Sequence, residues 1–210
     1  MWKDIVKESF KWYNSKEGRW NKNMSKLIWK SGTMLYPIPA VMVSCGSMEK
    51  PNIITIAWTG ILNSDPAMTY ISVRKERYSH KLISENKEFV INLVSKDLAK
   101  AADYCGVRSG EKEDKFKTLG LNTEKAENVS APLIKEAPVS IECRVEKVIE
   151  LGTHDMFMAK ILSVDVEEKY LDENGKFDME KCNLVAYSHG QYYTLGDRLG
   201  KFGFSVEKKK

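Results

Sequence analysis

Residues 139–168 read VSIECRVEKVIELGTHDMFMAKILSVDVEE, and this stretch decides the fold. Its first half alternates apolar and polar residues, a pattern typical of a half-buried β-strand, with Val139, Ile141, Cys143 and Val145 on one face. The alternation slips phase at Val148, and such a slip predicts a β-bulge of the kind that lets a sheet curl into a barrel. The second half, 154–168, is predicted to return as the other arm of a hairpin that turns near Gly152.

Four shorter runs upstream carry strand patterns: AVMVSCG at 40–46, NIITIAW at 52–58, AMTYISV at 67–73 and EFVINLV at 88–94. They are rich in β-branched and apolar residues, and Gly, Asn, Asp and Pro separate them. The last run alternates Phe89, Ile91 and Leu93, which predicts a strand that is buried on one face. Further along, Asn174-Gly175 predicts another hairpin turn.

Helical patterns interrupt the strands at 77–88, 96–106 and 113–120, and the last two end at glycine, as helices often do. The spacing shows no regular βαβ alternation. About six or seven strands with helices inserted between them therefore predict a mainly β fold, a closed antiparallel barrel rather than a parallel sheet.

The chain has 210 residues and no Ser-, Gly- or Pro-rich linker, so we expect a single barrel domain over residues 34–210. Residues 1–33 are predicted to form a helical N-terminal extension or arm, because the apolar residues of the first dozen fall at helical spacing. Trp20 and Trp29 of this arm are expected to lie across the body of the protein or a partner subunit, or else to belong to a loosely packed arm.

Composition excludes several function classes. The net charge of +4 is mild and Lys and Glu are mixed along the chain, so we expect no nucleic-acid partner. No apolar run is long enough to span a bilayer, and no P-loop, GxSxG or local metal motif occurs. The four cysteines are far apart and no export signal is present, which predicts reduced thiols in a cytoplasmic protein.

Two stretches point to a ligand. NIITIAWTG at 52–60 is a strand that runs into small residues beside the large Trp58, and SVRKERYSHKLI at 72–83 places basic and hydroxyl side chains before a predicted helix. Free N–H groups at a helix start, together with such side chains, suit a phosphate. The first stretch would suit a flat heterocycle, because the backbone polar groups of this stretch lie beside an apolar wall. The residues alone also allow a solvated, basic strand-to-helix connection.

These two stretches, together with CGVRSGEKEDKF at 105–116 and HGQYYTLGDRLGKFGFS at 189–205, resemble the flavin reductase-like family in the family's own order. The resemblance covers about residues 34–205 and is strongest to the flavoredoxins. It implies an antiparallel FMN-binding split β-barrel of the Greek-key type.

The resemblance also implies roles for thirteen cofactor-binding residues. Asn52 and Trp58 would flank the isoalloxazine ring, and the backbone of Thr55, Ala57 and Thr59 would bond its pyrimidine edge. The 5′-phosphate would lie among Arg74, Arg77, Ser79 and His80. Lys115 would contact the cofactor as a cation, His154 would lie near the flavin, and Tyr187 or Tyr192 would cover the site.

Residue type alone leaves a plainer interpretation equally open for Trp58 and favours one for Lys115 and His154. Trp58 could be a core residue, Lys115 part of a solvated helical face, and His154 a capping or surface histidine. Cys105 is interpreted as a buried structural thiol and His189 as a loop residue.

The family resemblance implies an oxidoreductase that passes electrons from NADH or NADPH through bound FMN to an unidentified acceptor. It implies no catalytic side chain and no metal, and it implies a homodimer. Two alternatives remain open: a flavoredoxin-type electron carrier reduced by a protein partner, and a non-catalytic ligand-binding β-barrel.

Overall fold

The computed structural model describes Lys26 and residues 29–207 of the chain. Contacts between Cα atoms divide the chain into two units, residues 1–35 and 36–210, and every described strand belongs to the second. The predicted helix over the first dozen residues, and Trp20 of the predicted arm, lie outside the described residues. No helix within residues 29–207 is long and apolar enough to cross a membrane.

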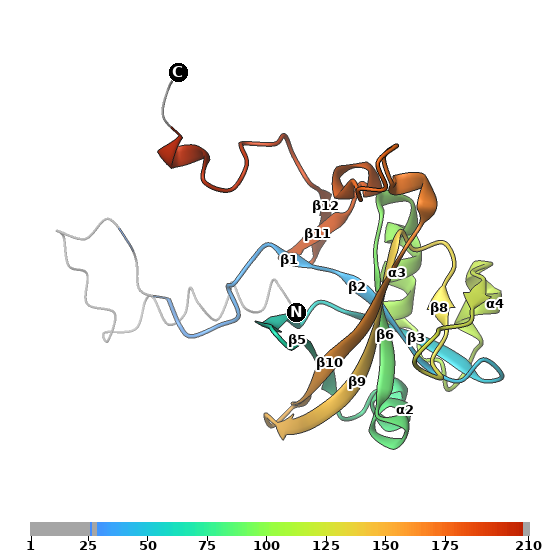
Figure 1. Ribbon diagram of the computed structural model, residues 1–210. Helices are drawn as coiled ribbons and strands as arrows, with labels where there is room; N and C mark the ends of the chain where they lie inside the picture. The colour runs from blue at the N-terminus through green and yellow to red at the C-terminus, as the bar shows by residue number, and fades with distance from the viewer. Residues whose placement is uncertain (1–25, 27–28, 208–210) are drawn as a thin grey trace, which may run out of the picture. The chain divides into compact units, whose positions relative to one another are not determined.

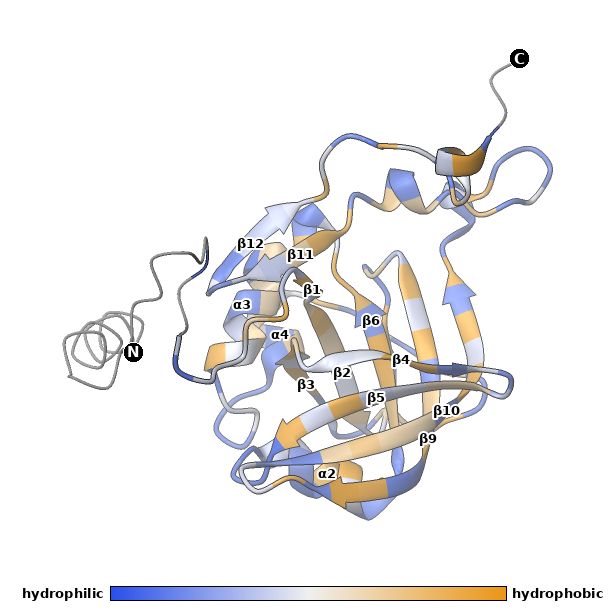
Figure 2. Ribbon diagram, turned by 90° about the vertical axis from the view of Figure 1, so that its left-hand side faces the viewer, coloured by the Kyte–Doolittle hydropathy of each residue, from blue (hydrophilic) through white to orange (hydrophobic). Residues whose placement is uncertain are grey.

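The main sheet has seven strands, and each neighbouring pair is antiparallel. Their order is β3 (Pro51–Ile56), β2 (Val41–Gly46), β6 (Glu88–Leu93), β9 (Val139–Glu150), β10 (His154–Val166), β5 (Ala67–Arg74) and β4 (Thr59–Ser64). The two edge strands, β3 and β4, follow each other in the chain and are joined by Ala57 and Trp58 alone. The sheet must therefore curl until its edges nearly meet (Figures 1 and 2).

No ladder joins β3 to β4 in the described part of the chain, so the barrel is split along this seam. The backbone N–H of Ser72 on β5 donates to the carbonyl of Trp58 at 2.8 Å, which holds the connection between the edges against the neighbouring strand. The predicted mainly β, antiparallel split-barrel fold is confirmed.

The long β9–β10 hairpin shows the predicted bulge. Met158 pairs with Lys147 and Ala159 pairs with Val145, so Glu146 is the extra residue on β9. This is the place where the apolar alternation slips, and a bulge there increases the local bend. The hairpin turns at Gly152, which has the positive φ of +87° that a tight turn requires.

The barrel interior is a closely packed apolar core. Strands from all round the barrel contribute to it, and Phe89, Phe157 and Ile71 are fully buried there. Burial of a large apolar side chain stabilises the fold by about 1.5–3 kcal/mol. The helix α2 (Tyr78–Asn86) supplies Ile83 to the same core.

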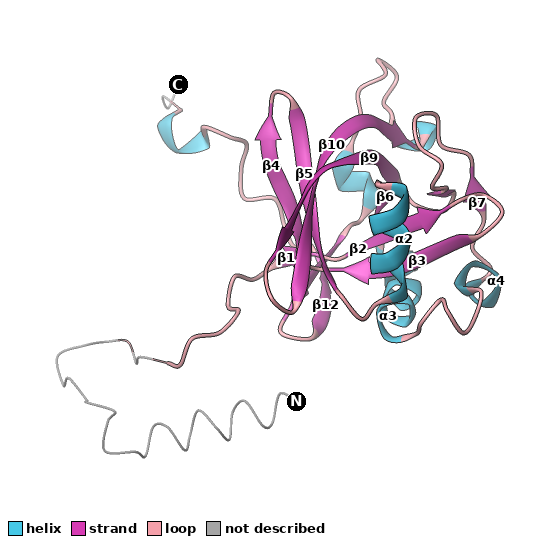
Figure 3. Ribbon diagram, turned by 90° about the horizontal axis from the view of Figure 1, so that it is seen from below, coloured by secondary structure: helices cyan, strands magenta, loops and turns pink. Residues whose placement is uncertain are grey.

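The three predicted helices are confirmed with small shifts of their ends. The segment 96–106 forms a 3₁₀ turn, η1 (Lys96–Leu98), and then α3 (Ala99–Val107), which packs against β3 (Figure 3). The short helix α4 (Lys115–Leu119) ends at Gly120, whose φ of +66° is left-handed. Further 3₁₀ turns are η2 (Glu168–Tyr170), η3 (Met179–Cys182) and η4 (Phe204–Val206).

Two small sheets flank the main one. The first has the order β1 (Ile38–Pro39), β11 (Val185–Ser188) and β12 (Gln191–Thr194), and the second pairs β7 (Thr123–Glu124) with β8 (Leu133–Ile134). The hairpin predicted at Asn174-Gly175 is only a local turn with one bridge, between Leu171 and Phe177. Asp172 closes it by accepting two backbone N–H groups, so no longer ladder forms.

The prediction for β6 was wrong, because both of its faces are buried. Phe89 and Ile91 face the barrel core, whereas Val90 packs against Ala126, Ala131 and Leu133. The segment that covers this second face comes some 40 residues later in the chain. A polar residue, Asn92, lies fully buried on the covered side.

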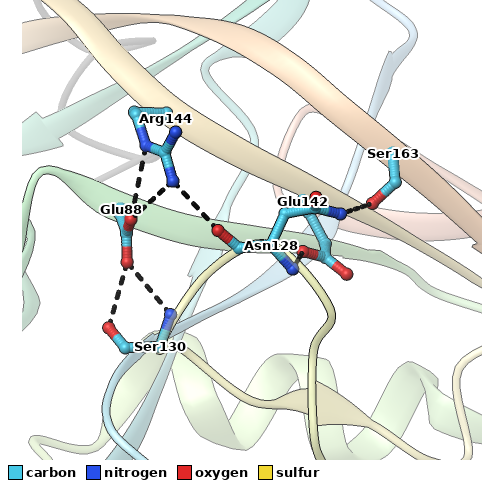
Figure 4. A network of polar contacts seen from close by, with 6 residues as sticks. All are labelled: Glu88, Asn128, Ser130, Glu142, Arg144 and Ser163. Atoms are coloured by element: carbon cyan, nitrogen blue, oxygen red, sulfur yellow. Dashed lines mark hydrogen bonds and ion pairs between the residues drawn. The ribbon is translucent and has the colours of Figure 1, made fainter.

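Carboxylates from the barrel strands hold the covering segment in place (Figure 4). Glu88 on β6 accepts the N–H and hydroxyl of Ser130 at 3.0 and 3.1 Å and pairs with Arg144 at 3.1 Å. The fully buried Glu142 on β9 accepts the backbone N–H groups of Glu127 and Asn128 at 2.8 and 2.6 Å. The loop thus satisfies the strand carboxylates while it buries the outer face of β6.

The Asn92→Ala variant tests this second layer. The Asn92 side-chain oxygen accepts the Ile134 N–H at 3.0 Å and the Ser140 hydroxyl at 2.7 Å. Loss of the amide leaves these buried donors without a partner, so we expect the free energy of unfolding to fall by about 1–3 kcal/mol per donor. Urea denaturation measures the change. The exposed Asn63→Ala serves as the control, and an equal effect of the two changes would contradict the account.

Candidate functional site

A pocket of about 230 Å³ lies where the start of α2 meets the end of α3 and the strand β3. Residues from four segments line it: Ile54, Glu76, Arg77, Tyr78, Ser79, Cys105, Arg108, Ser109, Gly110 and Lys115. Three of the lining side chains are cationic and one, Glu76, is anionic. The pocket is therefore suited to an anion.

The start of α2 offers backbone donors to the pocket. Arg77 is its N-cap residue, in an extended conformation, and makes no side-chain cap to the helix; the first turn contains no acidic residue. Tyr78 and Ser79, the first two helical residues, both line the pocket. An uncapped helix N-terminus of this kind attracts anions through its N–H groups and its dipole.

Ser79 is fixed at the pocket wall by Asn52. The Asn52 side-chain amide donates to the Ser79 hydroxyl oxygen at 2.7 Å, and both residues are buried. The Ser79 oxygen accepts this bond, so the hydroxyl can donate its own proton either to the neighbouring Cys45 sulfur or to a ligand. The predicted phosphate residues Arg77 and Ser79 thus line one pocket, and Asn52, which was predicted to flank the isoalloxazine ring, lies against Ser79 behind the pocket lining.

At Gly110 the backbone of the loop after α3 lies directly against the Asn52 side chain. A Cβ atom added at Gly110 would lie 1.8 Å from the Asn52 side-chain oxygen and 3.3 Å from Cε of Lys115. Since Asn52 is held by its bond to Ser79, it is not free to move aside. Only glycine allows the loop to approach this closely.

Lys115 lines the pocket next to Gly110. Its Nζ donates to the carbonyl oxygens of Cys105 and Arg108 at 3.1 and 3.0 Å, so it terminates α3 and shapes the loop that follows. The residue is only 4% exposed, and burial lowers its pKa below the ordinary value. An ammonium has three N–H donors, so one remains beyond the two carbonyls. The expectation of a solvated helical face is wrong at this position.

Two predicted phosphate residues lie outside the pocket lining. Arg74 pairs with Glu76 at 3.2 Å and partly neutralises the only lining carboxylate. The His80 ring points to Asp155, and its Nε2 lies 2.8 Å from the Asp155 carboxylate. The ring also packs edgewise on Phe157, with 5.3 Å between the ring centroids. Their roles at a phosphate remain predictions.

The other predicted ring-side residues, at positions 55–59, lie where β3 passes into β4. Trp58 is 36% exposed, which does not match the interpretation as a core residue. The Thr55 hydroxyl donates to the Ala102 carbonyl, and that of Thr59 donates to the Tyr70 carbonyl at 2.6 Å. Both hydroxyls are thus occupied. A planar ligand could therefore use only the face of Trp58 and those backbone groups of 55–59 that are not already paired with β2, β5 or Ser72.

The last three predicted residues do not line the pocket either. His154 pairs with Arg74 across the β10–β5 ladder, and burial and this neighbouring cation lower its pKa. Tyr187 and Tyr192 contact each other at 5.4 Å between ring centroids in the small sheet. Burial, followed by the nearby Asp103, raises the pKa of Tyr192 to about 12.

Sequence reasoning missed several wall residues. Arg108, Ser109 and Gly110 follow α3 directly, and the run of small and basic residues in this loop was a usable signal. Cys105 is buried at the pocket wall, as expected for a structural thiol, and burial raises its pKa to about 11. All four cysteines are buried and free.

The fold and site define a split-barrel protein with a cationic pocket at the start of α2, bordered by the edge strand β3. Residues 33–196 match the family model described as "Flavin reductase like domain", and the chain belongs to this family.

Solved structures and curated relatives agree with this assignment. The flavoredoxin of Desulfovibrio vulgaris (Miyazaki F) is 35% identical with a TM-score of 0.80, covering 88% of this chain and 100% of that chain. Flavoredoxin from Methanosarcina acetivorans is 31% identical with a TM-score of 0.79 and the same coverage. An uncharacterized protein of Archaeoglobus fulgidus is 34% identical over 160 residues, which is 76% of this chain and 89% of that protein.

The Gly110→Ala variant tests the close approach at the pocket wall. We expect the added methyl group to force the loop away from Asn52, at a cost of about 1–3 kcal/mol in the free energy of unfolding, as overpacking does. Gly196→Ala is the matched control, because a Cβ atom there meets nothing within 4 Å. Chemical denaturation of both variants measures the difference. Equal stabilities would show that the loop adjusts freely and would contradict the described geometry.

Proposed function

We propose that the protein binds FMN non-covalently, with the 5′-phosphate in the pocket between Arg77, Ser79 and Lys115. The observation that carries the proposal is the convergence of an uncapped helix N-terminus, a hydroxyl and three cations in one pocket. Such a donor set matches a phosphate in both charge and hydrogen-bond polarity. The likeness to two flavoredoxins over their whole length supports flavin as the ligand class.

The size of the pocket limits what it holds. Pockets that bury a whole drug-sized ligand measure about 300–1,000 Å³, and this one measures about 230 Å³. The pocket therefore takes the phosphate end, and the ring system would lie outside it, along residues 55–59 and the face of Trp58. The residues present fit the cofactor in this divided arrangement.

Bound FMN supplies reversible redox chemistry, and the protein supplies position and electrostatics. Arg77, Ser79 and the start of α2 would bind the phosphate, while Trp58 would limit water at the ring. No side chain of the site needs to act as a nucleophile. The proposed activity is transfer of electrons from NADH or NADPH through FMN to an acceptor.

A second candidate is a flavoredoxin-type carrier that a protein partner reduces. The 35% identity to a flavoredoxin favours it specifically. The four buried free thiols suit a reducing compartment, and we place either activity in the cytoplasm.

An anaerobic titration distinguishes the two candidates. FMN-loaded protein is expected to lose its visible flavin absorbance promptly on addition of NADH or NADPH. Absorbance that persists with both nucleotides but disappears with dithionite would instead establish the carrier. Failure of the purified protein to bind added FMN, measured by quenching of flavin fluorescence, would overturn the proposed function and leave a barrel for another ligand.

The proposal includes a homodimer. One subunit leaves the ring side of the site uncovered, and the segment after β12 exposes large apolar side chains, among them Leu199, Phe202 and Val206. Exposed apolar groups in such density mark interaction sites, and a second copy is the partner that would complete the site. Aromatic residues are also enriched in protein interfaces.

The double variant Leu199→Asp/Phe202→Asp tests this assembly. We expect the unaltered protein to be a dimer in size-exclusion chromatography with light scattering, and the variant to dissociate and lose FMN affinity at least about tenfold, which corresponds to about 1.4 kcal/mol. Leu151→Asp, at an exposed residue beside the β9–β10 turn, is the control. An unaltered chain that is monomeric and still holds FMN tightly would contradict the dimer.

A further inference from the structure

One continuous segment forms the phosphate side of the pocket. Residues 76–79 all line it and comprise the end of a turn and the first residues of α2. The residues on either side, Lys75 and His80, do not line the pocket. Both instead contact the same carboxylate, that of Asp155 on β10.

The two contacts use both oxygens of Asp155. Lys75 Nζ lies 3.2 Å from Oδ1, and His80 Nε2 lies 2.8 Å from Oδ2. Asp155 is only 6% exposed, and its place next to the turn is fixed because His154 pairs with Arg74 in the β10–β5 ladder. A single carboxylate therefore ties the two ends of the pocket segment to the barrel wall.

The surroundings of the carboxylate make it a rigid anchor. The His80 ring packs edgewise on the fully buried Phe157, and its other nitrogen lies 3.5 Å from the hydroxyl of Ser84. Lys75 also pairs with Glu150 at 2.8 Å, on the exposed side. Lys75, His80 and Glu150 are the charged or titratable groups joined to Asp155 in this network.

We propose that Asp155 is a positioning residue for the phosphate site. It does not touch the ligand. It holds residues 76–79 so that Arg77, Ser79 and the helix N–H groups point into the pocket before a ligand arrives. The inference rests on the proposed function, because it takes the phosphate of FMN as the group that these donors receive.

Preorganisation gives the anchor its effect on affinity. A segment that is already ordered loses less conformational freedom when the ligand binds. Burial would raise the pKa of Asp155, but the hydrogen bond from His80 and the ion pair with Lys75 outweigh it, so the pKa lies below its ordinary value. The carboxylate therefore stays charged and keeps both contacts throughout the neutral range.

A comparison of FMN binding with riboflavin binding distinguishes a positioning role of Asp155 from a general effect on stability. FMN carries the phosphate and riboflavin lacks it, whereas both carry the same ring system. A positioning role predicts weaker FMN binding with unchanged riboflavin binding. A merely structural role predicts that both flavins bind more weakly, together with a lower thermal midpoint.

The test compares the affinities of the full-length chain and its variants for FMN and riboflavin by fluorescence quenching. Asp155→Asn is expected to raise the Kd for FMN about tenfold, equivalent to about 1.4 kcal/mol, and to change that for riboflavin less than twofold. Lys75→Met changes a partly exposed side chain and is expected to raise the Kd for FMN about threefold, so it answers the question if Asp155→Asn does not fold. Glu150→Gln is the matched control, because Glu150 shares Lys75 but not His80, and it should change neither Kd more than twofold.

Three results would overturn the inference. The first is that the unaltered protein binds FMN and that Asp155→Asn and Lys75→Met bind it with the same affinity. This result would exclude the positioning role and leave the proposed function intact. Equal weakening of FMN and riboflavin binding would assign Asp155 a structural role only. An unaltered chain that binds riboflavin as tightly as FMN, or binds neither, would show that the pocket does not receive the phosphate, and the proposed function would fail first.

Discussion

The two-residue connection between β3 and β4 is the constraint on which the rest of the structure depends. These strands form opposite edges of a seven-stranded sheet, yet only Ala57 and Trp58 separate them in the chain. An extended residue spans about 3.3–3.6 Å, so the edges are kept within a short distance of each other. The sheet can satisfy this only by curling, and the bulge at Glu146 gives the long β9–β10 hairpin the bend that curling needs.

The same constraint places the candidate site. Closure turns β3 so that Ile54 faces the barrel core, while Ile53 and the Thr55 hydroxyl meet the layer that contains α3. The β3 residue Asn52 then reaches Ser79 at the start of α2. The loop after α3 rests on Asn52 at Gly110, and Lys115 pins that loop by its carbonyls. A cationic pocket thus forms from segments that are far apart in the chain, and Trp58, at the connection between the edge strands, remains partly exposed.

Sequence reasoning succeeded where the determinants are local. The phase slip at Val148 located the bulge, and glycine marked the end of α4, because strand period and helix termination are properties of neighbouring residues. Asn52, Arg77, Ser79 and Lys115 were named through a family resemblance, and the structure gathers them in or beside one pocket. The resemblance also named His80, whose ring instead meets Asp155, 75 residues later in the chain.

The failures share one physical cause, which is that tertiary packing, and not the neighbouring sequence, sets the partner of each residue. The covered outer face of β6 was unforeseen, because the segment around Ala126 and Ala131 returns from a distant part of the chain. Lys115 looked solvated because its sequence neighbours are charged. Nothing in that sequence reveals the two carbonyl oxygens that accept hydrogen bonds from its ammonium group. Asp155 carried no signal at all, since its contacts with Lys75 and His80 follow from the pairing of His154 with Arg74.

A crystal structure of the protein grown with FMN tests the central claim most directly. The account predicts the phosphate within hydrogen-bond distance of the Ser79 hydroxyl, the Arg77 guanidinium and the N–H groups at the start of α2, with the ring system along residues 55–59 and a second subunit over it. A flavin bound with its phosphate away from this pocket, or an empty pocket at saturating FMN, would contradict it.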